Sequence, residues 1–143
     1  MRTTHRTFPP RTGWSDPLPV SPETDVALVL AFGPVDAPDA RWFDTVRSAW
    51  PAARLVYVSG GGQIDGGRVI DEETVVCAIH FASTRVQAVA LDGVGVVPCE
   101  QLGRELGRAL ATTSDLRHVL VFCDGIALNG SAFVRGIRGA VPE

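Results

Sequence analysis

Lysine is absent from this 143-residue chain, in which all 13 strongly basic residues are arginine. Without lysine the chain forms no Schiff base, and it cannot supply the lysine of a nucleotide-binding phosphate loop. The 16 acidic residues outnumber the basic ones and leave a formal net charge of -3. No basic surface for nucleic acid or an anionic membrane is therefore expected.

Cysteines and long apolar runs are also scarce. Cys77, Cys99 and Cys123 form no CxxC pair and cannot all pair within one chain. This favours a reducing compartment, so we predict a cytoplasmic protein. The longest apolar runs have the length of a strand, and the first 24 residues lack the apolar centre of a secretory signal. Neither a membrane span nor an export sequence is expected.

Prolines concentrate at the start of the chain. Residues 1–24 hold five of the ten prolines and three arginines, a composition that favours an extended, unpacked arm. The sequence becomes apolar from residue 25 onward. The chain's length and its 45% hydrophobic content fit one folded domain, which we place at residues 25–143.

Strand and helix patterns alternate along this domain. The runs DVALVLAFG, ARLVYVS and HVLVFCDG predict buried strands at 25–33, 53–59 and 118–125. The runs ETVVCAIHF and RVQAVAL, at 73–81 and 85–91, predict a hairpin. Helices are predicted within 37–50 behind the capping residue Asp39, from Pro98 to Ala111, and within 129–139 behind Asn129. The order β-α-β-β-β-α-β-α predicts a layered α/β domain with a mixed sheet and helices packed on it.

Gly103 and Gly107 lie four residues apart inside the predicted helix that follows Pro98, with Ala111 next on the same strip. A glycine within a helix costs about 1 kcal/mol relative to alanine. Paired glycines therefore indicate a face that another element approaches closely. We expect a second element to pack directly against this strip.

The segment LVYVSGGGQIDGG suggests a nucleotide-binding hypothesis, because three glycines directly follow an apolar strand. The phosphate-loop pattern fails, since Gly66 is followed by Gly67 and Arg68 where lysine and Ser or Thr are needed. The dinucleotide pattern fails as well, because its third glycine, counted from Gly60, falls on Asp65. We interpret these glycines as structural: they allow turns and close approach of the backbone, and Asp65-Gly66 is a turn pair.

The histidines, the cysteines and the acidic run do not by themselves indicate a metal site or a catalytic site. His80 and His118 lie at apolar strands without the ligand cluster that zinc requires, although haem needs one strong protein ligand. Cys99 follows Pro98 at a helix start, where the helix dipole favours a thiolate. No local motif supplies a base or an oxyanion hole, so catalysis is not expected. The run Asp71–Glu73 is interpreted as a solvated loop.

Two glycine-containing segments carry a family resemblance. YVSGGGQI and VFCDGIALNG resemble the G-C-S-T-A-G-E-I and F-x-D-G-x-x-x-N segments of the N-terminal FIST domain. That domain is a sensory module of bacterial, archaeal and eukaryotic signal-transduction proteins. Gln63 stands where the family has an acidic residue. The matching residues are Ser59, Gly62, Ile64, Phe122, Asp124, Gly125 and Asn129.

The resemblance implies a non-enzymatic domain that senses a small molecule such as an amino acid. Some haem-binding members of the family sense nitric oxide, so a haem sensor using His80 or His118 is one alternative. A non-catalytic interaction or self-assembly domain is another. Such domains usually continue into a C-terminal FIST domain, which implies a short form here. A signalling partner is implied, and an uncovered sheet edge would favour a homo-oligomer.

The loops that follow the strands are our predicted binding site, because layered α/β domains commonly bind ligands there. Glycine backbone donors beside polar side chains suit a small polar ligand. We predict no metal and no cofactor at this site. The alternative interpretation makes the same residues turns and caps that serve the fold alone. The predicted ligand-binding residues are Ser59, Gly61, Gly62, Gln63, Asp124 and Asn129.

Overall fold

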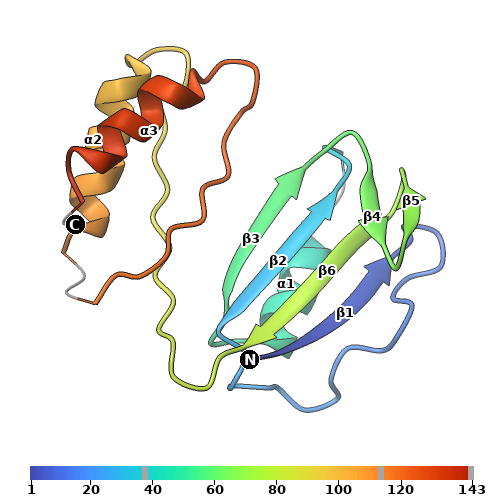
Figure 1. Ribbon diagram of the computed structural model, residues 1–143. Helices are drawn as coiled ribbons and strands as arrows, with labels where there is room; N and C mark the ends of the chain where they lie inside the picture. The colour runs from blue at the N-terminus through green and yellow to red at the C-terminus, as the bar shows by residue number, and fades with distance from the viewer. Residues whose placement is uncertain (37–38, 113–114, 142–143) are drawn as a thin grey trace. The chain divides into compact units, whose positions relative to one another are not determined.

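The computed structural model describes residues 1–36, 39–112 and 115–141, which fall into two units, residues 1–87 and 88–143 (Figure 1). Residues 37–38 of the first predicted helical segment and the last two residues of the predicted domain lie outside the described ranges. Within those ranges, no helix combines the length and the apolar character needed to cross a membrane.

The first unit is built on a mixed four-stranded sheet in the order β1-β6-β2-β3. β1 (Arg2–Phe8) and β2 (Leu28–Gly33) both pair antiparallel with β6 (Thr74–His80), whereas β3 (Arg54–Ser59) pairs parallel with β2. β6 and β2 are therefore central, and β1 and β3 are the edge strands (Figure 1). The mixed sheet and the presence of helices confirm the predicted α/β class.

The core of the first unit lies between the sheet and α1 (Ala40–Ala49), which covers one sheet face (Figure 1). The helix begins after Asp39, whose Oδ1 accepts a hydrogen bond from the Trp42 N–H at 2.9 Å, so the predicted cap is confirmed. Trp42, Val46 and Ala49 are buried on the sheet side of the helix. The buried sheet residues of the same core cluster are Val29, Ala31, Val76 and Ala78.

Residues 2–8 differ from the unpacked arm that the sequence predicted for residues 1–24. They form β1, in which Thr7 is buried, and the Phe8 ring lies 5.1 Å from that of Trp14. All five prolines of the predicted arm fall between residues 9 and 22, so residues 2–8 contain none. Averaging the composition over the whole segment hid a threonine-rich stretch that is well suited to a strand.

Two predicted strands are wrong. Residues 85–91 and 118–125 adopt no strand, although β6 forms where the sequence placed it. Both sides of β6 are occupied, by β1 and β2, so β6 offers no edge for the predicted hairpin partner. The elements described in the second unit are helices, so residues 118–125 have no strand partner within that unit. A β-branched run favours extended backbone, but a strand also needs a neighbouring edge.

A short hairpin, absent from the predicted order, lies within the glycine-rich segment. β4 (Gln63–Asp65) pairs antiparallel with β5 (Arg68–Ile70), and Asp65 lies opposite Arg68. The two residues between them, Gly66 and Gly67, have φ angles of 55° and 82°. A two-residue turn of this kind requires positive φ at both positions, which glycine adopts without steric cost. The turn pair is therefore Gly66-Gly67, one residue beyond the predicted pair Asp65-Gly66, because Asp65 pairs with Arg68 as the last residue of β4.

The second unit contains α2 (Cys99–Leu110) and α3 (Gly130–Arg138), which pack against each other (Figure 1). They meet at glycines: a Cβ added to Gly103 would collide with the carbonyl oxygen of Phe133 in α3. A Cβ on Gly107 would lie 3.0 Å from the Ile137 carbonyl oxygen. The close approach predicted at Gly103 and Gly107 is confirmed, and α3 is the element that makes it.

Candidate functional site

A hollow of about 310 Å³ lies beside the glycine-rich loop of the first unit. It is formed near the carboxyl ends of β2 and β3, the two parallel strands, where the loop turns into β4. Two predicted ligand residues, Gly62 and Gln63, line it, and Gly61 in the same loop and Ser59 at the end of β3 are exposed. Its lining residues are Phe32, Gly62, Gln63, Ile64 and Val75.

Backbone N–H groups are the donors of this loop. The Gly60 N–H donates to the Gly33 carbonyl oxygen at 3.1 Å and so continues the pairing of β3 with β2. The N–H groups of Gly61 and Gly62 donate to no acceptor in the described part of the chain. No atom lies within 4 Å of a Cβ built on Gly61, so this part of the loop is open to a ligand.

Asp71 places a carboxylate next to the loop. A Cβ built on Gly62 would lie 3.1 Å from Asp71 Oδ1. Asp71 is exposed, and among the described residues no ion pair engages it. The sequence interpretation of residues 71–73 as a solvated run did not connect Asp71 with Gly62. Their proximity depends on the β4–β5 hairpin, which folds the chain back on itself.

Gln63 has a structural task beside the hollow. Only 4% of the residue is exposed. In the amide orientation that satisfies its surroundings, the side-chain nitrogen donates to the carbonyl oxygens of Ile70 and Glu73, at 2.8 and 3.0 Å. These bonds tie β4 to β5 and to the start of β6. Gln63 therefore shapes the wall of the hollow, and its amide donors are already used.

The other two predicted ligand residues lie in the second unit, before α3. Asp124 Oδ1 accepts hydrogen bonds from the N–H groups of Ala127 and Ile126, at 3.0 and 2.8 Å, and these bonds lower the pKa of Asp124. Asn129 Oδ1 accepts the Ala132 N–H at 3.1 Å and caps α3, as predicted. Both side chains stabilise local backbone, and their role in binding a ligand stays a prediction.

His80 is held by charged neighbours. It is buried, its Nδ1 lies 3.0 Å from Asp25 Oδ2, and Arg2 Nη2 lies 3.0 and 3.2 Å from its two ring nitrogens. This arrangement does not suit an axial haem ligand, which needs a ring nitrogen free for iron. His118 is exposed in the second unit. Within the described ranges, no three His, Cys, Asp or Glu residues form a cluster suited to a metal ion.

We expect Asp25 to contribute to stability near neutral pH. The hydrogen bond with His80 is the main cause that lowers the pKa of Asp25. Because the folded-state pKa is the lower one, this stabilisation is fully present above the unfolded pKa, about 4, and is lost as pH falls through the folded pKa. Between about pH 5 and pH 3, the urea midpoint should fall less steeply for Asp25→Asn than for the wild type.

The matched control for this measurement is Asp16→Asn, because Asp16 is exposed and lies outside the contacts of His80. Its urea midpoint should follow the wild-type dependence on pH. Equal slopes for Asp25→Asn and the wild type would show that the Asp25–His80 contact does not stabilise the folded state.

Cysteine geometry gives no support to a thiol enzyme. Cys99 Sγ accepts the Asn129 N–H at 3.3 Å, which joins the first residue of α2 to the cap of α3. Cys77 lies 3.8 Å from His5 Nε2, but burial raises the pKa of the Cys77 thiol. A raised pKa disfavours the thiolate, which is the nucleophilic form.

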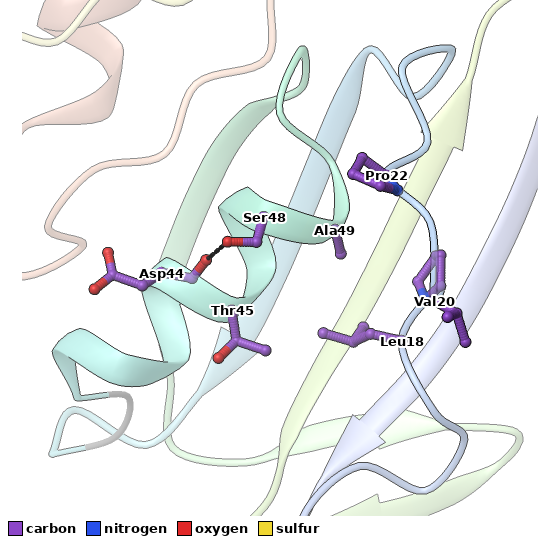
Figure 2. A pocket seen from close by; sticks show the side chains of 8 residues that line it. Leu18, Val20, Pro22, Asp44, Thr45, Ser48 and Ala49 are labelled. Carbon is purple, nitrogen blue, oxygen red and sulfur yellow. Dashed lines mark hydrogen bonds between the residues drawn. The ribbon is translucent and has the colours of Figure 1, made fainter.

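A second hollow, of about 460 Å³, lies between α1 and the proline-rich segment 18–22 (Figure 2). Thr45 and Ser48 donate their hydroxyl hydrogens to the carbonyl oxygens of Arg41 and Asp44, at 2.7 and 2.8 Å, so these donors are used within the helix. Figure 2 shows Thr45 facing Leu18 and the Asp44 carboxylate pointing away from the segment. None of the predicted ligand residues lines this second hollow.

Comparison with known proteins finds a family that matches the chain. The family model of the FIST N domain matches residues 27–143, which is more than half of the chain. The match begins after β1 and includes every other helix and strand described above. No curated protein and no solved structure matches the chain.

Proposed function

Because the chain belongs to the FIST N domain family, a family of sensory modules in signal transduction, we propose that it senses a small zwitterionic ligand such as an amino acid. The observation that carries the proposal is the hollow beside the glycine-rich loop. There the free N–H groups of Gly61 and Gly62 adjoin the carboxylate of Asp71 and an apolar wall.

The free N–H groups are the donors for a ligand carboxylate. Successive backbone N–H groups in a glycine segment form concavities that bind anions. Ser59, the last residue of β3, shares the sheet face of Leu55 and Tyr57, so its hydroxyl does not face this hollow and the donors are those of the backbone. The lack of side chains at Gly61 and Gly62 lets a carboxylate approach the backbone closely.

Asp71 is the acceptor for a ligand ammonium group. Its carboxylate lies beside Gly62 and is unpaired in the described structure, so a bound ammonium group would form its first ion pair. Because Asp71 is exposed, this ion pair contributes about 1 kcal/mol or less. Asp71 therefore favours zwitterions over simple carboxylates without excluding the latter.

The remaining lining fits an aliphatic side chain. Phe32, Ile64 and Val75 give the hollow apolar walls. Its volume of about 310 Å³ lies at the lower end of the range for small-molecule sites, which is about 300–1,000 Å³. A single amino acid fits this volume better than a nucleotide does.

We also propose that the protein is cytoplasmic and that its role is non-catalytic. FIST N domains are sensory, non-catalytic modules. Cys77, Cys99 and Cys123 are all free thiols, which suits a reducing compartment. A ligand signal would pass to a signalling partner or a C-terminal FIST domain.

We expect one or a few aliphatic amino acids to raise the melting temperature in a thermal-shift screen of the 20 standard amino acids. A ligand that binds the folded state alone adds about 2.7 kcal/mol of stability at 100 times its Kd. Titration calorimetry should then show that Asp71→Asn weakens binding by up to about fivefold, the size of a surface ion pair.

Asp65→Asn is the matched control for Asp71→Asn. Asp65 lies in the same hairpin, opposite Arg68, and only Asp71 has its carboxylate beside Gly62, so the loss of Asp65 should leave the affinity unchanged. The proposal fails if no amino acid stabilises the folded wild type at millimolar concentration. It also fails if both Asn variants weaken binding equally.

A further inference from the structure

Gln63 binds the main chain on both sides of the bend that carries Asp71. This bend runs from Ile70, the last residue of β5, to Glu73, the residue before β6. The side-chain nitrogen of Gln63 donates to the carbonyl oxygens of both end residues, at 2.8 and 3.0 Å. We call these two hydrogen bonds the Gln63 clamp. Because Asp71 directly follows Ile70, the clamp fixes the bend at both ends around it.

The bend lies against the glycine-rich loop. Asp71 Oδ1 lies 3.1 Å from the position of a Cβ built on Gly62, the residue before Gln63. The clamp itself is buried: Gln63 is 4% exposed, and Ile70, its partner in the hairpin register, is 9% exposed. A buried amide that uses both of its donors is held in one orientation. All of these residues belong to the first unit, so the clamp and the carboxylate that it holds lie within one unit.

We propose that Gln63 is a positioning residue, which holds the Asp71 carboxylate where it binds the ammonium group of a zwitterionic ligand. This role rests on the proposed function, because Asp71 acts on a ligand bound in the hollow. Many exposed ion pairs contribute nothing measurable, since ordering the two partners offsets their attraction. A bend that is already fixed at both ends reduces this cost. Gln63 thus determines the preference for zwitterions without contacting the ammonium group itself.

The two carbonyl oxygens of the clamp require a neutral donor at position 63. Glutamine presents an amide nitrogen with two hydrogens, one for each oxygen. A carboxylate of similar shape has no hydrogen to donate and places its negative charge against both oxygens. In Gln63→Glu, burial and these oxygens raise the pKa of the new carboxyl. Its protonated form donates one hydrogen bond, so part of the clamp is present below this pKa and is lost as pH rises through it.

The charged residues around position 63 shift this pKa in the same direction. β6 carries no charged side chain from Thr74 to Ile79, and the loop at residues 60–62 consists of glycines. Four of the five charged residues in the hairpin and the bend are acidic, and a nearby negative charge disfavours a carboxylate. These five residues are Asp65, Arg68, Asp71, Glu72 and Glu73.

Titration calorimetry of the full chain between about pH 6 and pH 8 tests the proposal. The probes are valine, leucine and isoleucine, each paired with the carboxylic acid that has the same carbon skeleton but no amino group. The wild type should bind its preferred amino acid about two to five times more tightly than the paired acid at every pH. In Gln63→Glu this preference should disappear at the upper pH, as in Asp71→Asn, and return in part as pH falls. Gln63→Met, which has no donor, should lack the preference throughout.

Gln87→Glu is the matched control for Gln63→Glu. Gln87 is exposed in the first unit and lies outside the hairpin and the bend, so this variant adds the same charge without touching the clamp. It should keep the wild-type preference for the amino acid at every pH.

Exchange of side-chain amide hydrogens with water, measured by NMR on the wild type, tests the clamp without a ligand and without a variant that has to fold. Both Gln63 side-chain hydrogens should exchange more slowly than those of the exposed Gln87 and Gln101. Equal rates would overturn the proposal. A wild type that binds amino acids, with a preference that folded Gln63→Glu and Gln63→Met both retain, would overturn this proposal alone. A wild type that binds none of the probes would overturn the proposed function as well.

Discussion

Gly103→Ala is expected to destabilise the packing of α2 on α3 by about 1–2 kcal/mol. The new Cβ would collide with the Phe133 carbonyl oxygen and lie 3.1 Å from the Ile137 nitrogen. These atoms belong to the main chain of α3, so no side-chain rotation relieves the collision and the helices have to separate. Overpacking of this kind costs about 1–3 kcal/mol or more. The gain of about 1 kcal/mol in helix propensity offsets part of it.

Hydrogen exchange of the α2 and α3 amides measures this loss, because both helices should lose protection together. Gly136→Ala tests the same contact from α3, since its Cβ would collide with the Glu100 carbonyl oxygen. Gly130→Ala is the control: no atom lies within 4 Å of a Cβ at that position, and stability should change by less than about 0.5 kcal/mol. Unchanged protection in Gly103→Ala would contradict the close approach of the helices.

Trp42→Ala is expected to lower the stability of the first unit by about 3–5 kcal/mol, the cost of replacing a buried tryptophan with alanine. Trp42 is 3% exposed and fixes α1 to the sheet. Its ring lies 5.9 Å from those of Trp14 and Tyr57 and 5.3 Å from that of Phe43. Its indole N–H has no partner in the described structure. The expected loss therefore comes from apolar packing and from the cavity left behind.

Urea unfolding followed by far-UV circular dichroism measures this effect. Trp42→Phe keeps an aromatic ring in the cluster and removes the unpartnered buried N–H, so it should lose less than half as much stability as Trp42→Ala. Val20→Ala, at a fully exposed position, should change stability by less than about 0.5 kcal/mol. A wild-type midpoint for Trp42→Ala would show that this aromatic cluster does not stabilise the unit.

The three helices were predictable because their signals are local. Asp39 and Asn129 cap the helices that the sequence placed behind them, and Pro98 directly precedes α2. The glycines at 103 and 107 indicated a close neighbour before its identity was known. Each of these signals acts within one or two turns of helix, so a single sequence contains it in full.

The strands were less predictable because pairing is not local. β1 was missed, and residues 85–91 and 118–125 were assigned as strands in error. The backbone preference of these runs is visible in their residues. The occupation of both sides of β6, by β1 and β2, is not. A segment's own sequence does not reveal which strand edges the rest of the chain has already used.

In the candidate site, too, the local features could be predicted from the sequence and the features that depend on the fold could not. Gly61 and Gly62 could be predicted, because glycines after a strand expose backbone donors. The burial of Gln63 and the position of Asp71 could not, since both depend on how the β4–β5 hairpin folds over the start of β6. A polar residue type does not show whether its hydrogen bonds go to a ligand or to the backbone.

Because of β1, the folded unit begins earlier in the chain than the family match does. The family match starts at residue 27, whereas the sheet begins at Arg2. A fragment cut at the homology boundary would lose the strand that covers one side of β6, where the buried residues Val76 and Ala78 lie. A central strand would then become a long, apolar edge, the type that recruits other chains into aggregates. In recombinant expression of the first unit, residues 1–26 therefore keep it soluble by covering this edge of β6.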